Sequence, residues 1–506
     1  MKLSMSIHLL VAPPASGKTR ACLAQVAAAF QAQPFASVWL LVPDRLQADE
    51  ARARLAQTGL VLPVHVATFY DLHQEMLELS GCSLPVASSA MLHRLLQEVI
   101  RSLDEAGQLP YYHPICRLPG FQVEMRDRIA ELKRALVQPE RLSALAQERA
   151  SPGLLELAHI YAAYQAHLQA LDWADREGLS WLAYKALLDD PNLMADMSLL
   201  VVDGFDNFNP AQLRTLKTLA GRAVHTWITL PGTPTMARLA HQRFASVLEN
   251  LLAGQPVELK TLPEKPHLPP SLAHLEAVLF ETQVEPAVAG PDLQRIEINS
   301  PAEEAREALR WLKARHLRQG VPLTKCGVAV PELDSYRAAL RSAAGEFGLR
   351  LTFSQGERLA STPAAAAMLD LLGLALNDYP QRPLLDTIRS PYFDLSALGL
   401  PRQTAKLLEI ASRFGQVVQG LEQWAETLTG LASRAPSSGN PQEIDEEDAA
   451  LPRLPEGELA ANLFGGLRTL AARLAPPAGE LPLKNWALWL QDLLESLGFF
   501  TCLDQA

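Results

Sequence analysis

The sequence lacks several features that would assign it to whole classes of protein. No apolar run in its 506 residues approaches the roughly 18 residues of a membrane span. The short apolar stretch near the N-terminus runs into two prolines, so we expect neither a membrane anchor nor a signal peptide. The five cysteines show no CxxC spacing, which argues against a zinc site, an iron–sulfur cluster and a disulfide framework. These absences favour a cytoplasmic protein.

An excess of positive charge is also missing. The formal net charge is −11, which by itself disfavours nucleic acid as a partner. That objection is limited, because phosphate contacts depend on local basic patches rather than on the total charge. Two helical segments carry such groups: Arg306, Arg310 and Lys313 share one face, and residues 121–137 add Arg126, Arg128, Lys133 and Arg134. Basic residues in this arrangement are more often a solvated helix face than a DNA groove.

A phosphate-binding pattern is present near the N-terminus. Residues 12–19 read APPASGKT and match GxxxxGK[ST] except at Ala12, where the pattern has its first glycine. An apolar run of strand length (7–11) precedes them, and an alanine-rich helical segment (19–30) follows. Backbone N–H groups and the dipole at a helix N-terminus favour an anion. Because proline has no N–H, the donors must come from Ala15, Ser16, Gly17, Lys18 and Thr19.

This arrangement predicts a bound nucleoside triphosphate, with Lys18 at the β- and γ-phosphates and the Thr19 hydroxyl on Mg²⁺. A chance match at a strand–helix turn is the competing interpretation. The Mg²⁺ ion also needs a carboxylate at the end of a neighbouring strand. Asp203, which closes the apolar run 198–202, is the candidate; alternatively, it is a turn residue at the end of a strand.

The residue after Asp203 bears on turnover. Motor ATPases usually place there a glutamate that activates the attacking water, whereas this sequence has Gly204. Asp206 is the only nearby carboxylate and a weak candidate for that catalytic role. General-base catalysis contributes about 10²–10⁴-fold. We therefore expect magnesium binding with weak or absent hydrolysis.

The distribution of strand and helix patterns predicts an α/β protein. Strands are expected at 7–11, 37–42 and 64–67, and again at 197–202 and 224–230, with helical periodicity at 90–107, 121–137 and 157–171 between the two groups. Parallel βαβ units follow from that order. We interpret residues 1–75 and 196–260 as one α/β domain, interrupted by a helical insertion at 76–195.

A second α/β pattern follows a proline-rich linker, residues 261–292. Strands are expected at 294–298, 326–330 and 349–353, with helices at 302–318 and 335–347, which makes 293–363 part of a second α/β domain. Residues 364–506 are expected to be a helical insertion. Within it, the proline-containing and then acidic segment 434–456 is expected to be a mobile loop.

Five segments, in this order, resemble the AddB/RexB-type subunit, the partner of the AddA helicase–nuclease in bacterial double-strand-break repair and recombination. They are APPASGKT (12–19), LLVPDRLQADEARARL (40–55), VATFYDLHQEML (66–77), LLVVDGFDNFNPAQ (199–212) and IRSPYF (388–393). The resemblance implies two RecA-like P-loop domains of the superfamily 1 helicase type, each with a helical insertion. It also implies ATP and Mg²⁺ as cofactors, held by Gly17, Lys18, Thr19 and Asp203.

The same resemblance implies DNA, single-stranded or as duplex ends, and an AddA-type subunit as partners, with the two chains forming a heterodimer. Thr68 and Phe69 match the motif that touches single-stranded DNA in helicases, where an aromatic ring can stack on a base. A core aromatic after a strand is the competing interpretation of Phe69. Pro43 and Asp44 match a motif that contacts the DNA backbone.

Departures from the helicase pattern argue against a motor. The glutamine motif before the phosphate-binding loop is missing, residues 231–235 replace a Gly-Asp…Gln segment, and Pro331 stands where a motor places an arginine finger. Longer members of the family end in a nuclease domain that holds an iron–sulfur cluster. Because its residues are missing here, we expect no such cluster in this chain, which looks truncated.

Three hypotheses remain open. The leading one is an ATP-binding, DNA-binding subunit of an ATP-dependent helicase–nuclease, without motor or nuclease activity of its own. The second is an active superfamily 1 DNA translocase with divergent motifs. The third is a P-loop kinase or small-molecule NTPase unrelated to DNA, which suits the acidic charge but not the second α/β domain.

Overall fold

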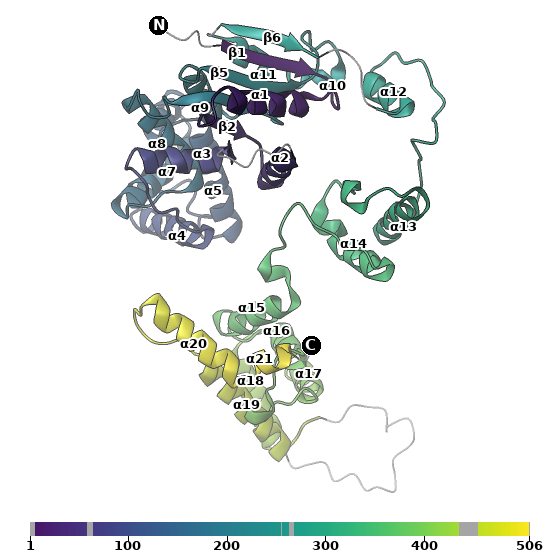
Figure 1. The fold of residues 1–506 in the computed structure, drawn as a ribbon. Coiled ribbons are helices and arrows are strands. Elements are labelled where there is room, and N and C mark those ends of the chain that lie inside the picture. The colour runs from purple at the N-terminus through teal and green to yellow at the C-terminus, as the bar shows by residue number, and fades with distance from the viewer. Residues whose placement is uncertain (1–5, 58–63, 255, 263–267, 435–453, 505–506) are drawn as a thin grey trace. The chain divides into compact units, whose positions relative to one another are not determined.

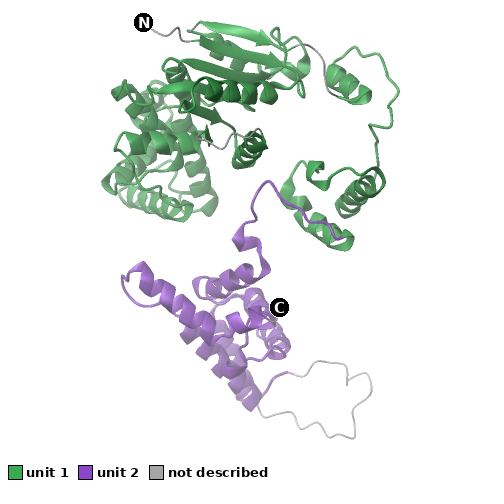
Figure 2. Ribbon diagram, viewed as in Figure 1, with its two compact units in different colours: residues 1–347 green, residues 348–506 purple. Residues whose placement is uncertain are grey.

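A computed structural model describes residues 6–57, 64–254, 256–262, 268–434 and 454–504. The chain divides into two compact units, residues 1–347 and 348–506 (Figure 2). The first unit contains a parallel sheet, and the second is helical. Within the described residues, no helix combines the length and the apolarity needed to cross a membrane.

The sheet has six strands in the order β3-β2-β4-β5-β1-β6, all paired in parallel (Figure 1). β5 lies between β1 and β4, with Ile7 opposite Thr226 and Val201 opposite Trp227. The strands are β1 (Ser6–Ala12), β2 (Ser37–Leu41), β3 (Val64–Ala67), β4 (Met197–Val202), β5 (His225–Pro231) and β6 (Val257–Thr261). The first five confirm the predicted strands, and β6 was not predicted.

Helices cover both faces of the sheet, because its central strands are apolar on both sides. One face packs on α1 (Lys18–Ala32) and α2 (Arg45–Gln57), with Val26 and Leu55 against strand residues such as Val201. The other face packs mainly on α3 (Phe69–Leu79), α8 (Arg176–Asp189), α9 (Pro210–Ala220) and α11 (Ala245–Leu252). The carboxyl ends of the strands therefore open between two helical layers.

A helical bundle is inserted between α3 and β4. It has its own core, in which Ile129, Ile160 and Tyr161 are buried. Its helices before α8 are α4 (Ser89–Glu105), α5 (Pro119–Arg134), α6 (Pro139–Glu148) and α7 (Pro152–Ala170). A buried ion pair joins α5 to the start of α8: Lys133 Nζ lies 2.6 Å from Asp175 Oδ2. α4, α5 and α7 confirm the helices predicted here.

The remainder of the first unit follows β5. α10 (Leu239–Gln242) precedes α11, and after β6 the chain forms α12 (Pro270–Val278), α13 (Pro301–Gln319) and α14 (Leu333–Phe347). α12 lies inside the segment expected to be a linker. α13 and α14 confirm two predicted helices, and they pack on each other, with Leu309 and Leu340 buried.

The expected strands at 294–298, 326–330 and 349–353 are wrong, because no strand is found in residues 293–363, all of which are described. Ile296 and Val328 in these segments are exposed. An extended segment becomes a strand only when a neighbour pairs with its N–H and C=O groups, and here none does. A second sheet-containing domain is therefore not part of this structure.

The second unit is built from helices around one apolar core that contains Trp424, Leu408 and Leu467. They are α15 (Pro363–Leu376), α16 (Gln381–Arg389), α17 (Thr404–Phe414), α18 (Leu421–Ala432), α19 (Glu458–Leu474), α20 (Leu483–Ser496) and α21 (Phe499–Leu503). The helical character predicted from residue 364 onward is confirmed. Most of the loop expected at 434–456, namely residues 435–453, lies outside the described residues.

Candidate nucleotide site and adjoining cleft

The phosphate-binding loop makes a tight turn between β1 and α1. Ala15 has φ 59° and Gly17 has φ 88°, and the Ser16 N–H donates to the Pro13 carbonyl at 3.4 Å. A Cβ on Gly17 would meet nothing within 4 Å, so the backbone conformation, rather than lack of space, favours glycine there. The first N–H groups of α1 have no partner within the helix. The loop is therefore shaped to receive an anion.

Lys18 is the first residue of α1, and its side chain folds back over the loop. Its Nζ donates to the carbonyl oxygens of Ala12 at 2.7 Å and Pro13 at 2.8 Å. Burial lowers the pKa of Lys18, while the negative charges of Asp203 and Glu276 act in the opposite direction. The ammonium group thus donates to two neutral carbonyl oxygens of the loop. A charged phosphate oxygen could replace them as the acceptor.

Asp203 lies just after β4, at the same sheet edge as the loop, because carboxyl ends of parallel strands meet there. Its side chain is buried, with the residue only 6% exposed. The Thr229 hydroxyl on β5 donates to Asp203 Oδ1 at 2.7 Å, and the Asp203 N–H donates to the Leu41 carbonyl at 3.0 Å. One carboxylate oxygen therefore remains for a cation. Magnesium bound by Thr19 and Asp203 stays a prediction.

The described residues contain no group of three or more His, Cys, Asp or Glu side chains that could hold a metal ion. A dedicated protein cage is not needed for Mg²⁺ in such a site, because one or two protein oxygens combine with phosphate oxygens and water. The donor set of Thr19 and Asp203 fits that chemistry.

Gly204 has φ 84°, and a Cβ there would lie 2.5 Å from Gln47 Oε1 and 3.4 Å from Pro43 Cδ. The Asp206 side chain is 67% exposed, and its Oδ2 lies 3.7 Å from Arg243 Nη2. The structure therefore shows Asp206 in a surface ion pair, and its weak candidacy for a catalytic role stays a prediction.

The segment after β5, where residues 231–235 replace a helicase motif, also borders the loop. The Gly232 N–H donates to the Ala12 carbonyl at 3.1 Å, and this bond ties the two loops together. Arg238 and His241 follow, and both contact Glu276 of α12. Glu276 lies 35 residues after His241 in the sequence, and only the folded path of the chain brings α12 beside this site. The sequence alone therefore could not reveal the contact.

A cleft of about 1080 Å³ is lined by Pro43 and Phe205, which lie close to Gly204. It lies between the carboxyl ends of β2, β3 and β4 and the inserted bundle. Four arginines from three helices line it, together with aromatic and acidic side chains. The arginines are Arg45 of α2, Arg126 and Arg134 of α5, and Arg176 of α8. The cleft therefore brings together cations that are far apart in the sequence.

Thr68 and Phe69 both border this cleft, but their side chains serve the fold. Thr68 caps α3 in a reciprocal arrangement with Asp71, whose Oδ2 accepts from the Thr68 N–H at 2.9 Å. Phe69 is only 5% exposed, and its ring packs edge-on against Phe205 and Phe208. The prediction that Phe69 stacks on a base is therefore not supported by the structure, because the ring is a core element.

Tyr70 is the aromatic residue that the sequence reasoning missed. It lines the cleft and is half-buried, and the Arg176 guanidinium lies 5.3 Å from its ring centroid. The first turn of α3 directs Phe69 into the core and Tyr70 to the cleft. Because Tyr70 follows Phe69 directly in the motif, sequence reasoning could have included it.

The predicted basic helix faces are largely engaged within the protein. Arg306 pairs with Glu346, and Lys313 Nζ donates to the Phe347 carbonyl at 2.6 Å. Lys133 is buried with Asp175 rather than solvated. Of these groups, Arg126 and Arg134 reach the cleft.

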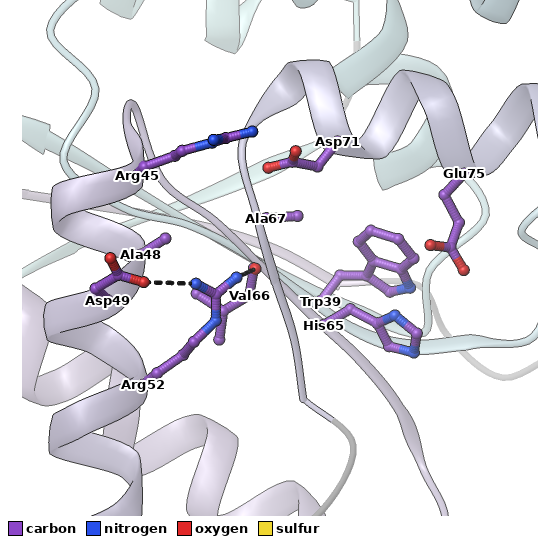
Figure 3. A pocket seen from close by; sticks show the side chains of 10 residues that line it. All are labelled: Trp39, Arg45, Ala48, Asp49, Arg52, His65, Val66, Ala67, Asp71 and Glu75. Carbon is purple, nitrogen blue, oxygen red and sulfur yellow. Dashed lines mark hydrogen bonds and ion pairs between the residues drawn. The ribbon is translucent and has the colours of Figure 1, made fainter. Parts of the chain in front are cut away.

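A second pocket of about 340 Å³ lies beside the edge strand β3 (Figure 3). His65 stacks on Trp39, with ring centroids 4.5 Å apart. Arg52 donates to the Val66 carbonyl at 2.6 Å and pairs with Asp49 at 2.8 Å, as the dashed lines show. Arg52 thus covers an edge carbonyl that another strand could otherwise use.

Comparison with known proteins relates the chain to one family. Residues 10–247 match the family model described as "ADDB, N-terminal". The chain is 24% identical over 433 residues to an ATP-dependent helicase/deoxyribonuclease subunit of the AddB type from Heliobacterium modesticaldum, which covers 78% of this chain and 34% of that protein. The proteins of the same name from Symbiobacterium thermophilum and Moorella thermoacetica are 23% and 25% identical, over 36% and 37% of their lengths. The chain thus spans about a third of the length of these relatives.

Proposed function

We propose that the chain, whose residues 10–247 match the AddB N-terminal family model, is an AddB-type subunit that binds ATP with Mg²⁺ in its first unit and DNA in the cleft described above. It acts as a non-motor part of an ATP-dependent helicase–nuclease in double-strand-break repair and recombination. The observation that carries the proposal is that Lys18 and Asp203 lie at one edge of a parallel sheet, where the charge of Asp203 acts on Lys18.

The sheet order supports a RecA-like P-loop domain for residues 1–75 and 196–260. One strand, β5, separates the strand before the loop from the strand before Asp203. Ala15, Ser16, Gly17 and Lys18 would hold the phosphate chain through backbone N–H groups and the ammonium group. Thr19 and Asp203 would hold Mg²⁺, which supplies charge neutralisation at the phosphates.

Two features support nucleotide binding without efficient turnover. Gly204 supplies no carboxylate where motors place a general base, and Gln47 and Pro43 occupy the space beside it. Asp206 is exposed and paired with Arg243. ATP then acts as a ligand that stabilises one state of the protein, rather than as a fuel for translocation.

The cleft supports DNA binding despite the net charge of −11. Arg126 pairs with Asp127 at 2.9 Å, so Arg45, Arg134 and Arg176 are the proposed phosphate contacts. Tyr70 offers a ring on which a base can stack. Single-stranded DNA, or the unpaired strand of a duplex end, suits such a surface. The partner that we propose is an AddA-type subunit, since the relatives are described as subunits of a helicase/deoxyribonuclease.

Nucleotide titration of the 506-residue chain tests the proposal. A fluorescent ATP analogue should bind in the presence of Mg²⁺, and Lys18→Ala should weaken binding at least about tenfold, because a charged hydrogen bond contributes about 1.5–3 kcal/mol. Lys185→Ala, at an exposed lysine of α8, serves as the control and should bind as the unaltered chain does. No binding by the unaltered chain would refute the nucleotide site. Fast ATP hydrolysis stimulated by single-stranded DNA would refute the non-motor role.

A further inference from the structure

Three residues near the phosphate-binding loop form what we call the Glu276 cluster: Arg238, His241 and Glu276. Arg238 Nη1 lies 2.8 Å from Glu276 Oε1, and Arg238 Nη2 also donates to the Glu276 backbone carbonyl. His241 Nε2 lies 3.8 Å from the same carboxylate oxygen. One carboxylate on α12 therefore faces two basic side chains from the segment after β5.

Of the two basic side chains of this cluster, His241 is buried and Arg238 is half-buried, and each has a buried nitrogen atom without a hydrogen bond in the part of the chain that the structure describes. His241 is only 3% exposed, and among the described residues neither His241 Nδ1 nor Arg238 Nε finds a hydrogen-bond partner. Buried polar groups are normally satisfied, and an exception calls for an explanation such as a ligand. Arg238 Nε lies 3.9 Å from Glu281 Oε1, an ion-pair contact too long for a hydrogen bond. The two nitrogen atoms, His241 Nδ1 and Arg238 Nε, therefore point to an anion that reaches both of them.

The cluster adjoins the phosphate-binding loop. The Gly232 N–H bonds to the Ala12 carbonyl, and a Cβ on Gly232 would lie 3.4 Å from His241 Cγ, so the segment is packed closely beside the loop. The charges interact as well. Glu276 acts to raise the pKa of both Lys18 and His241, although burial is the largest influence and lowers both. Glu276 thus acts on both Lys18 and His241, and Glu281 also acts to raise the pKa of His241.

We propose that Arg238 and His241 form a second anion position of the nucleotide site, and that Glu276 occupies it until the phosphate chain of a nucleoside triphosphate replaces it. This inference rests on the proposed nucleotide binding and extends it to residues outside the loop. Arg238 and His241 are binding residues in this arrangement, and Glu276 is a competitor carried by the chain itself.

Release of Glu276 has a consequence for α12, because this helix has no buried residue. Among the described residues, the polar contacts between α12 or the residues just after it and the segment after β5 are those of Glu276 and Glu281. The Leu239 N–H donates to Glu281 Oε1 at 3.0 Å, and Arg238 Nε lies 3.9 Å from the same oxygen. A helix held by few polar contacts opens easily when they are lost. Triphosphate binding should therefore loosen α12.

Calorimetric titration of MgATP into the full chain and its variants tests the inference. Glu276→Gln removes the competing charge and should bind MgATP at least about fivefold more tightly. Arg238→Gln should bind roughly tenfold more weakly. In the double variant the gain from Glu276→Gln should vanish, because the two residues act on one position. Glu249→Gln, at an exposed glutamate of α11, is the matched control and should leave the affinity unchanged.

Hydrogen exchange provides a readout independent of affinity. With saturating MgATP, the amides of residues 270–278 should exchange faster, while those of α13 should not change. Unchanged affinity in Glu276→Gln, with binding still lost in Lys18→Ala, would overturn the inference and leave the nucleotide site standing. The inference would also be overturned if Glu276→Gln raised the affinity for MgATP as much in the Arg238→Gln variant as in the unaltered chain. Unchanged hydrogen exchange in α12 on addition of MgATP would overturn it as well. If neither the unaltered chain nor Glu276→Gln binds MgATP, both proposals fail.

Discussion

Gln47 Oε1 lies 2.5 Å from the point at which a Cβ on Gly204 would stand. Asp44 orients the glutamine, since its Oδ1 accepts from the Gln47 N–H at 2.8 Å and its Oδ2 from Gln47 Nε2 at 3.3 Å. The start of α2 therefore fills the space where a motor ATPase would carry its catalytic glutamate. This packing supports the proposed non-motor role.

Gly204→Glu should not restore ATP hydrolysis. The residue has φ 84°, a conformation that costs an L side chain about 1–2 kcal/mol, and the new side chain would also displace Gln47. We expect a lower melting temperature and hydrolysis no faster than that of the unaltered chain, measured by phosphate release with single-stranded DNA present. Gly254→Glu, also at positive φ but with open space around its Cβ, separates backbone strain from the collision. A variant that gained DNA-stimulated turnover would contradict this account.

Tyr70→Ala should weaken binding of single-stranded DNA more than Phe69→Leu does. Base–aromatic stacking contributes about 1–3 kcal/mol per base, and Tyr70 borders the cleft whereas Phe69 is packed against Phe205. Fluorescence anisotropy with a labelled oligonucleotide measures both affinities. Phe69→Leu should instead lower the melting temperature, because it removes core packing. If Phe69→Leu weakened DNA binding more than Tyr70→Ala did, the DNA contact would lie at Phe69, as the helicase motif predicts.

Stability of the first unit should depend on the protonation of His73. Burial lowers the pKa of this residue to about 4, below the value of about 6.5 in an unfolded chain. The unfolded state therefore binds the proton more readily, and the stabilisation present above a pH of about 6.5 is lost as the pH falls toward about 4. At pH 5 the loss relative to pH 7.5 should be about 2 kcal/mol.

Thermal unfolding at pH 7.5 and pH 5 measures this dependence. His73→Gln removes the titrating group and should reduce the difference between the two melting temperatures. His159→Gln, at an exposed histidine of α7, should preserve the full difference. Equal pH dependence in all three proteins would mean that His73 does not carry the effect.

The sequence located Lys18 and Asp203 because each follows a central strand closely, and residues at the carboxyl ends of parallel strands converge. The edge strand β6 was missed because Glu258 and Lys260 interrupt its apolar character. The opposite error, at 294–298, arose because an alternation of polar residues with Ile296 and Ile298 says nothing about whether a partner strand exists. Strand formation depends on a neighbour, whereas α13 and α14 could be predicted from local periodicity.

Within the candidate site, prediction failed where a side chain's direction decides its role. Thr68 and Phe69 were found by motif, yet the start of α3 turns Phe69 inward and leaves Tyr70 at the cleft. Arg238 and Glu276 could not be associated from the sequence, because their contact depends on the path of the chain through β6 to α12. The local motif could be recognised, and the long-range partners could not.

The position of β1 in the sheet sets when the phosphate-binding loop can fold relative to the inserted helical bundle. Among the described residues, β1 pairs with β5 and β6, which begin at His225 and Val257. The loop that follows β1 is therefore supported by strands that are synthesised more than two hundred residues after it. Contacts between such distant segments slow folding, and the inserted bundle, whose contacts are local, can form in the interval. A nascent chain should therefore carry a folded bundle well before it can hold a ligand.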